Sequence, residues 1–537
     1  EPQICGYVPP AKKDVVSEAS QGGEQESVQG KVVFPGQRVE YQLDTQPQLP
    51  SSLAYGIKSV SFTDSYDRYL KPDKQTLEMM DLNTGKPVSK KKYTTKWDDS
   101  RHMFTLTVTD QETIGQWRAG TNPRIQVRFE GTVSDDAPTD HKVNNKWVLT
   151  LNNSLTPSNE VFNIPPTLNP KKKDTQKDPT IDIDGMTALL GDEIYYRVDI
   201  DATQTNQAYK VWRLGMTDDY DDSYLKLDAS KVEITDETGK DVTARFNIQD
   251  KDGVLYAYAK TVDTEVPATG ETVKGDPQPT DLKAYSESDE HNPLTQPSID
   301  QTLLGHTYTA TMPMTVIKVT DGYVVRNKAT QVLNKVRKDT NEVTNPLKPV
   351  NPSKDVTVKV GGESVNGRSI YKGRTFLYQL DSSIIPADRA YPQVDQWKIV
   401  DPLNTEYDQY TGQWAVYATR DLYAGGQVVA AKGDRIAGNG FDSSKFGGDL
   451  FTATADGNGQ VTVEATDLYR QLVSTDIDHE AGWRAYIQCK RVKVGERIEN
   501  QFTEIFNDKN LPSNIVWTRT PDMTPGIHIE KYDVASG

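Results

Sequence analysis

The sequence predicts an all-β protein made of antiparallel β-sandwiches. Many short segments rich in Thr, Val and Tyr alternate apolar with polar residues, a period of two that is typical of half-buried strands. Gly, Pro, Asn and Asp separate these segments, which favours sandwiches over α/β units. A helical period is found only in Asp110–Trp117 and Ala465–Leu472, each about two turns long. The clearest strand segments are Val39–Leu43, Phe104–Val108, Ile125–Phe129, Ile194–Ile200, Val356–Val360 and Thr375–Leu380.

Length and charge narrow the classes of protein to consider. A chain of 537 residues is too long for one core, and about 150 residues per domain predicts three or four domains. The 61 Lys and Arg residues against 77 Asp and Glu residues give a net charge of −16, so we expect no nucleic-acid partner. No window approaches the ~18 apolar residues of a membrane span, so we expect no membrane insertion. Any export signal or anchor is expected to lie outside this chain.

Cysteine use is too low to organise the fold. Cys5 and Cys489 lie near opposite ends of the sequence and form neither a disulfide framework nor a zinc site. We expect both thiols to be unpaired, with Cys489 filling a strand that includes Ala485–Cys489. Low cysteine use is typical of cytosolic proteins and also of exported bacterial proteins whose domains are stabilised by other means, and composition alone does not separate the two.

The chain contains an internal repeat that begins with Pro followed closely by Lys-Asp. The three copies end in Asp14, Asp174 and Asp355, and each is followed by a predicted strand with a similar pattern of apolar and polar residues. These markers predict three sandwiches, at residues 1–168, 169–350 and 351–522. Residues 523–537, which include the strand-like stretch Pro525–Asp533, are expected to open a following domain or to form a linker.

Each repeat also carries an ordered Lys, Asp and Asn. The lysine lies in the first strand, the aspartate follows an apolar stretch, and the asparagine lies in a late strand-like segment. In the second repeat Lys171 and Lys172 compete with Lys173, and Asn334 is a rival to Asn327. The three predicted sets are Lys13, Asp64 and Asn159; Lys173, Asp218 and Asn327; and Lys354, Asp401 and Asn514.

A lysine, an aspartate and an asparagine buried together can form a covalent bond. Burial lowers the pKa of a lysine and raises the pKa of a carboxyl group, so the amine becomes a nucleophile and the acid can polarise the carboxamide. Attack of the lysine Nζ on the asparagine Cγ with loss of ammonia gives an isopeptide bond, with the aspartate in the catalytic role. The alternative is that these residues are ordinary linker, turn and strand-end residues, since Asp and Asn are common in turns.

This arrangement resembles the C-terminal domains of streptococcal antigen I/II surface adhesins and of enterococcal aggregation substances. The likeness includes Tyr410–Trp414 and Tyr486–Gln488 and is most specific in residues 351–520. It implies a variant immunoglobulin-like (DEv-IgG type) sandwich in each repeat, stacked in an elongated rod. It also implies a Lys–Asn isopeptide assisted by Asp in each repeat, and extracellular display anchored in the cell wall of a Gram-positive bacterium.

The function predicted on this basis is adhesion. We expect attachment to a host glycoprotein or a bacterial surface ligand, leading to aggregation and biofilm formation, by a monomeric rod. The alternative is a purely structural stalk or pilus-like spacer without a ligand site of its own, and an extracellular carbohydrate-active enzyme is a distant third. A concave pocket lined with aromatic residues would favour the adhesin.

The remaining candidate sites are a calcium site and an enzyme site. Asp218–Asp222 places four carboxylates in five residues, so Asp219, Asp221 and Asp222 are predicted Ca²⁺ ligands, with a solvated acidic turn as the alternative. No nucleophile elbow, zinc-protease motif, phosphate loop or dinucleotide fingerprint is present. We therefore expect no enzyme beyond a single self-crosslinking event, and no cofactor other than structural calcium.

Overall fold

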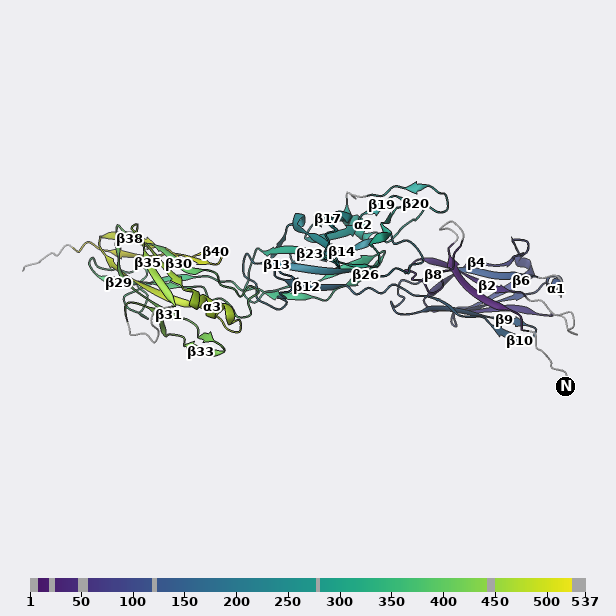
Figure 1. The fold of residues 1–537 in the computed structure, drawn as a ribbon, viewed down its shortest axis with the longest axis horizontal. Helices are drawn as coiled ribbons and strands as arrows, with labels where there is room; N and C mark the ends of the chain where they lie inside the picture. The colour runs from purple at the N-terminus through teal and green to yellow at the C-terminus, as the bar shows by residue number, and fades with distance from the viewer. Residues whose placement is uncertain are drawn as a thin grey trace, which may run out of the picture.

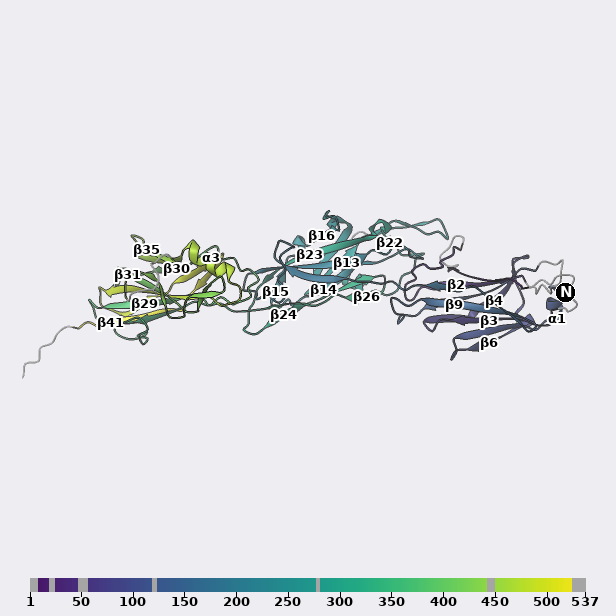
Figure 2. The same cartoon turned by 60° about the horizontal axis from the view of Figure 1, so that its bottom comes forward.

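The computed structural model describes residues 8–18, 25–46, 57–117, 123–276, 281–441 and 450–523. Three β-rich bodies lie end to end along the long axis, with the N-terminal and C-terminal thirds of the described chain at its two ends (Figure 1; Figure 2). Every sheet is antiparallel, and each draws its strands from one third of the chain. The predicted all-β class of three tandem sandwiches in a rod is therefore confirmed. Cys5 and the predicted segment beyond Met523 lie outside the described residues.

Domain 1 contains two sheets whose inner faces enclose one apolar core. The N-terminal strand lies at the edge of the first sheet, because β1 pairs with β2 only. The first sheet has the order β1 (Ala11–Ser17), β2 (Arg38–Thr45), β8 (Ile125–Val133), β4 (Leu70–Asp81) and β5 (Lys86–Pro87). The second has the order β10 (Ser154–Pro157), β9 (Val143–Leu151), β3 (Val60–Tyr66), β7 (Met103–Val108) and β6 (Tyr93–Asp98), with β11 (Val161–Asn163) also on β9.

Domain 2 repeats this plan and adds a long insertion between β18 and β23 (residues 260–305), which we call the excursion. Its first sheet comprises β12 (Lys171–Thr175), β13 (Glu193–Ala202), β23 (His306–Val316), β15 (Leu225–Leu227) and β16 (Glu233–Asp236). Its second comprises β17 (Phe246–Lys251), β18 (Val254–Ala259), β14 (Leu214–Asp219), β25 (Ala329–Leu333) and β26 (Val336–Asp339), and β24 (Val324–Asn327) pairs separately with β27 (Val343–Pro346). The excursion holds β19 (Thr261–Val262), β20 (Thr264–Glu265), β21 (Thr272–Val273), α2 (Leu282–Glu287) and β22 (Ser298–Ile299).

Domain 3 has the same two-sheet plan around its own core. Its first sheet has the order β28 (Ser353–Thr357), β29 (Thr375–Asp381), β37 (Trp483–Arg491), β31 (Asp408–Ala418) and β34 (Arg435–Gly438). Its second has the order β35 (Phe451–Ala455), β36 (Gln460–Ala465), β30 (Trp397–Pro402), β39 (Thr503–Phe506) and β40 (Lys509–Pro512). Two short ladders pair β32 (Leu422–Ala424) with β33 (Gln427–Ala430) and β38 (Gly495–Asn500) with β41 (Val516–Thr520).

The elements follow the sequence pattern closely where the period of two is strict. Burial alternates residue by residue along β13, as a strand with one face on the core requires. The two predicted helices are present as α1 (Gln111–Gln116), whose N-cap Asp110 accepts from the Thr113 backbone N–H, and α3 (Asp467–Thr475). The short helix α2 was not predicted, and the predicted strand Val356–Val360 ends early at Thr357. Of the helices described, none is long and apolar enough to cross a membrane. The 3₁₀ turns are η2 (Lys90–Lys92), η3 (Ala229–Lys231), η4 (Thr243–Arg245) and η5 (Gln301–Leu303).

The two junctions between domains use the same contacts. At the first, the Tyr209 hydroxyl accepts from the Glu18 backbone N–H (2.9 Å) and donates to the Arg38 carbonyl, and Lys335 pairs with Asp135 (2.7 Å). At the second, the Tyr391 hydroxyl donates to the Glu193 carbonyl, and Lys509 pairs with Asp192 (2.9 Å).

Apolar side chains also cross each junction. Phe34 of domain 1 is 1% exposed and belongs to the core of domain 2, and Leu189 of domain 2 belongs to the core of domain 3. Repeating the same polar and apolar contacts at both junctions fixes the domains in line, which explains the rod seen in Figure 1 and Figure 2.

Candidate functional site

Each domain buries one lysine–aspartate pair between its two sheets. The lysine lies on the edge strand of the first sheet, and the aspartate lies on a central strand of the second sheet. All six side chains are 0% exposed, and in each pair the lysine Nζ donates to the aspartate Oδ2. The pairs are Lys13 and Asp64 (β1, β3), Lys172 and Asp218 (β12, β14), and Lys354 and Asp401 (β28, β30).

A buried asparagine accompanies each pair at an equivalent position. Asn145, Asn327 and Asn500 are at most 5% exposed, and each faces the aspartate of its domain closely enough to lower the pKa of that carboxyl group. Their equivalence follows from the register, because each pairs with a buried valine of the last strand: Asn145 with Val161, Asn327 with Val343, and Asn500 with Val516.

These three amides lack the hydrogen bonds that buried amides normally make. Neither Oδ1 nor Nδ2 of Asn145, Asn327 or Asn500 forms a hydrogen bond with any described residue. More than 90% of buried polar groups in proteins are satisfied, and an unsatisfied one costs about 1–3 kcal/mol. Three equivalent exceptions in three domains therefore indicate a shared role for the amide.

Burial moves the pKa values of the charged pairs toward their neutral forms. In Lys13, Lys172 and Lys354, loss of hydration is the largest effect and lowers the pKa, while the paired aspartate opposes it. For the aspartates the sign is reversed, since burial raises the pKa and the lysine opposes it. The neutral amine and the neutral acid are thus both more accessible than they would be in water.

An aromatic ring lies under each lysine amine. The Nζ atoms lie 5.2 Å from the ring centre of Tyr41, 4.9 Å from that of Tyr196 and 4.4 Å from that of Tyr378. These tyrosines occupy equivalent positions on β2, β13 and β29, opposite the residue that lies two places after the lysine. The rings complete an apolar enclosure around the amine and exclude water from it.

The structure corrects two of the predicted asparagines. Asn159 and Asn514 are exposed, and their side chains bond to the backbone of the lysine rather than to its amine. Asn159 Oδ1 accepts from the Lys13 N–H (2.9 Å) and its Nδ2 donates to the Lys13 carbonyl (2.8 Å); Asn514 does the same at Lys354. Asn341 is their equivalent at Lys172 in domain 2. These asparagines therefore bind the backbone of the lysine strand, and none of their hydrogen bonds is to the lysine amine.

Lys173 is also corrected, to its neighbour Lys172. The side chains of β12 alternate between the core and solvent, and Lys173 is exposed whereas Lys172 is buried. The sequence contains a pattern that favours Lys172 over Lys173, because Pro-x-Lys in Pro170–Lys172 matches Pro-x-Lys in Pro352–Lys354. A shared pattern of Val or Ile, any residue, Asn, and Lys or Gln likewise marks the buried asparagines: Val143–Lys146, Val325–Lys328 and Ile498–Gln501.

The rival residues and the predicted calcium ligands have other contacts. Asn334 is buried in a turn, where its Oδ1 accepts from the Trp212 N–H (3.0 Å). Asp219 is exposed, and Asp221 accepts from the Tyr323 hydroxyl. Across the described ranges, no three His, Cys, Asp or Glu side chains, Asp222 included, are grouped so as to hold a metal ion. Calcium binding stays a prediction from the sequence.

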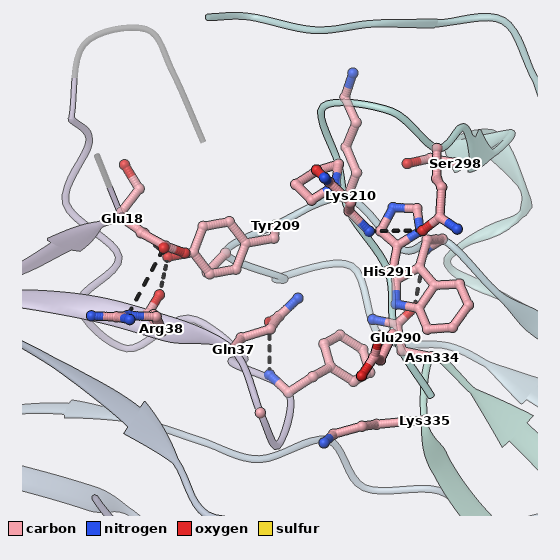
Figure 3. Close-up of a pocket in the computed structure, with 18 of the residues that line it drawn as sticks. Glu18, Gln37, Arg38, Tyr209, Lys210, Glu290, His291, Ser298, Asn334 and Lys335 are labelled. Atoms are coloured by element: carbon pink, nitrogen blue, oxygen red, sulfur yellow. Dashed lines mark hydrogen bonds and ion pairs between the residues drawn. The ribbon is translucent and has the colours of Figure 1, made fainter. Parts of the chain in front are cut away.

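A cleft of about 1050 Å³ lies at the junction of domains 1 and 2. Its walls come from the end of β1 and the turn before β2 on one side and from the excursion of domain 2 on the other. Figure 3 shows Tyr209 reaching toward Glu18 and Arg38, with His291 on the far side of the cleft. The His291 ring stacks on Trp212 at 4.7 Å, and burial lowers the pKa of His291 to about 4, so the ring is neutral near pH 7. The sequence pattern did not predict this cleft.

Comparison with known families decides what the three domains are. The model of the cell surface antigen I/II C2 terminal domain matches residues 10–165 and again residues 170–347. The model of the cell surface antigen C-terminus matches residues 351–521. The chain belongs to the antigen I/II family. Its three sandwiches are therefore C-terminal domains of a cell surface antigen of this family.

Individual relatives of these antigen I/II domains are distant. An aggregation substance of Enterococcus faecalis (strain ATCC 700802 / V583) is 29% identical over 310 residues, covering 57% of this chain and 20% of that protein. The chain thus spans about a fifth of that relative's length. The Streptococcus agalactiae BspA C-terminal domain is 18% identical with a TM-score of 0.48, covering 65% of this chain and all of that one. The Streptococcus pyogenes AspA C-terminal domain is 20% identical with a TM-score of 0.49, covering 66% of this chain and 99% of that one.

Proposed function

We propose that this antigen I/II chain is the C-terminal stalk of a cell-wall-anchored adhesin, locked by one Lys–Asn isopeptide bond in each domain. The observation that carries the proposal is the threefold recurrence of a buried Lys–Asp pair beside an asparagine amide without hydrogen bonds. The bonds would join Lys13 to Asn145, Lys172 to Asn327 and Lys354 to Asn500. The reaction is a single event in each domain, so the chain is not a turnover enzyme.

The geometry supplies each step of this reaction. A proton passes from the lysine ammonium to the paired aspartate, which leaves a neutral amine beside a neutral acid. The acid polarises the asparagine carbonyl, Nζ attacks Cγ, and the new Nζ–Cγ bond forms as the Cγ–Nδ2 bond breaks. Nζ then loses a second proton, which the aspartate relays to Nδ2 so that it leaves as ammonia. The proton first taken from the ammonium stays on the aspartate, which ends as the neutral acid.

Energetics favour this reading over a purely structural ion pair. A buried ion pair commonly contributes little, because the loss of hydration offsets the attraction between the charges. Each centre carries in addition an unsatisfied amide that costs about 1–3 kcal/mol. All three domains therefore contain both a buried ion pair and an unsatisfied amide, two features that disfavour folding. Their repetition is explained if the unreacted centre is the precursor of a covalent bond.

The intact mass of the purified chain tests the proposal. We expect a mass lower than that of the sequence by three molecules of ammonia, one for each domain. Protease digestion should yield three branched peptides that link Lys13 with Asn145, Lys172 with Asn327 and Lys354 with Asn500. A mass equal to that of the sequence would refute the crosslinks.

The interdomain cleft favours an adhesive role over a pure spacer. It is concave, it contains Trp212, Tyr209 and His291, and exposed charges such as Lys210 and Glu290 line it. The proposed ligand is a host glycoprotein or a bacterial surface component, and binding would promote aggregation and biofilm formation. A spacer would instead carry a ligand-binding head elsewhere on the protein.

Bead binding separates the adhesin from the spacer. Beads coated with the chain should attach to host cells or to bacteria, and exchanging charges in the cleft (Lys210→Glu with Glu290→Lys) should reduce attachment at least threefold. Exchanging Lys359→Glu with Glu363→Lys on exposed positions of domain 3 is the matched control and should have no effect. Beads that never attach, or that attach equally with both variants, would leave the spacer as the function of this region.

A further inference from the structure

Domain 2 carries an acid at a core position where its two sister domains carry valine. Asp174 lies two residues after Lys172 on β12, so both side chains point to the core, and Asp174 is 0% exposed. The equivalent residues, Val15 after Lys13 and Val356 after Lys354, are also 0% exposed. Domain 2 thus places a second carboxyl group beside its lysine amine.

This extra carboxyl group has no partner that would balance a charge. Neither oxygen of Asp174 makes a hydrogen bond with a described residue. Tyr196 lies opposite Asp174 in register, and its hydroxyl group is likewise unbonded within the described ranges. From β27, Asn345 uses its Nδ2 on the Ile183 carbonyl (3.0 Å) and keeps a free Oδ1, which can accept from Asp174 only if Asp174 is protonated.

The neighbouring carboxylates favour the neutral form of Asp174, and the Lys172 ammonium favours its ionised form. Burial is the main cause that raises the pKa of Asp174 to about 7; Asp184 and Asp182 on the following connection contribute to this rise, and the Asn345 amide opposes it. Asp218 approaches from β14 through its pair with Lys172. In the other direction, an ionised Asp174 raises the pKa of Lys172 and so stabilises the ammonium form.

The two sister domains lack this uncompensated acid. In domain 1, Asp64 is the carboxyl group that acts on the pKa of Lys13. In domain 3, a second buried acid, Asp408, is present, but it is paired with Arg491 (2.7 Å) and accepts from the Tyr378 hydroxyl (2.8 Å). Asp408 and the buried Cys489 thiol also raise the pKa of Lys354, but Asp408 has the Arg491 guanidinium as its partner, whereas Asp174 has no partner among the described residues.

We propose that Asp174 is a positioning residue that makes self-crosslinking of domain 2 depend on pH, whereas the centres of domains 1 and 3 react independently of pH. The inference rests on the crosslinking function proposed above. In domains 1 and 3 the proton moves within the Lys–Asp pair, so the reactive neutral pair forms without exchange with solvent. In domain 2 an ionised Asp174 holds Lys172 as the ammonium, which has no lone pair to attack Asn327. Rising pH therefore slows this one bond.

Refolding of the full chain from inclusion bodies tests this pH dependence, because a chain that has never folded starts unreacted, which an intact mass equal to that of the sequence verifies before dilution. The chain is diluted into buffers between about pH 5.5 and about pH 8.5, which bracket neutrality, and is quenched over time. Digestion and mass spectrometry then give the crosslinked fraction of each domain separately. We expect the rate in domain 2 to fall about thirtyfold across this range, since the protonated fraction of an acid falls about tenfold per unit above its pKa and the range ends about 1.5 units above that of Asp174. Domains 1 and 3 in the same tube are the internal controls.

Two substitutions identify the group responsible. Asp174→Asn keeps the shape without the charge, and Asp174→Val copies domains 1 and 3; both should make the domain 2 rate independent of pH. Equal pH profiles for the three wild-type domains, or a domain 2 profile that survives both substitutions, would overturn the inference. If no domain loses ammonia at any pH, the crosslinking function itself is refuted. The two failures are therefore distinguishable.

Discussion

Asn145→Ala will abolish the crosslink of domain 1, whereas Asn159→Ala will leave it formed. The reason is that Asn145 faces Asp64 in the core. Asn159 is exposed, and both polar atoms of its side-chain amide form hydrogen bonds with the backbone of Lys13. Each variant is compared with the mass calculated from its own sequence. We expect Asn145→Ala to be lighter by two molecules of ammonia and Asn159→Ala to be lighter by three. Peptide mapping should show an unmodified Lys13 in the first variant alone.

Domains 2 and 3 offer matched pairs for the same experiment. Lys172→Ala should prevent the bond of domain 2, and its neighbour Lys173→Ala should not, because only the first side chain faces the core. Asn500→Ala should prevent the bond of domain 3, and Asn514→Ala should not. Loss of the backbone bonds at Asn514 should cost about 1–2 kcal/mol of domain stability without changing the crosslink. Crosslinks that follow Asn159 and Asn514 instead would contradict the geometry.

The contrast between these asparagines shows what the sequence could specify. A repeat with one lysine, one aspartate and one late asparagine is visible in the primary structure, and the structure brings Lys13 to Asp64 and Lys354 to Asp401 as expected. The period of two predicts strands reliably, because alternate burial is a local property of the chain. The fold class therefore followed from the sequence alone.

The choice among neighbouring residues did not follow from local pattern. Lys172 and Lys173 differ only in which face of β12 they occupy, and a shift of one residue exchanges the faces. Asn159 and Asn145 both lie near Lys13, but which of them points into the core depends on the pairing of β9 with β3 and β11. The interdomain cleft is harder still, since residues about 170 positions apart, such as Arg38 and Tyr209, form it together.

The crosslinks should raise the stability of each domain by about 5 kcal/mol. Lys13 and Asn145 are 132 positions apart, the other two pairs lie farther apart, and closing a loop of this length removes that much conformational entropy from the unfolded chain. For domains of this size, 5 kcal/mol corresponds to about 10–20 °C in melting temperature. We expect Asp64→Ala, Asp218→Ala and Asp401→Ala each to lower the melting temperature of the affected domain by at least this amount, measured by calorimetry.

A control variant separates the covalent bond from the buried charge. Asp64→Ala also leaves Lys13 unpaired in the core, which costs stability by itself. Lys13→Met combined with Asp64→Leu removes both charges and fills the space, so it lacks only the crosslink. We expect this double variant to melt well below the wild-type domain. A melting temperature equal to that of the wild type would show that the crosslink contributes no stability.

Stretching a single molecule gives the most direct readout, because each bond joins the first strand of its domain to a late strand. In domain 1, a chain pulled from its ends carries force through Lys13 and Asn145, so the residues between them cannot extend. At about 3.4 Å per residue, the wild-type domain should release about 450 Å less contour length than Asn145→Ala. The Asn159→Ala domain should extend as little as the wild type does. Full extension of the wild-type domain would contradict a covalent bond at this site, whereas the short extension would establish that the rod bears load through its crosslinks.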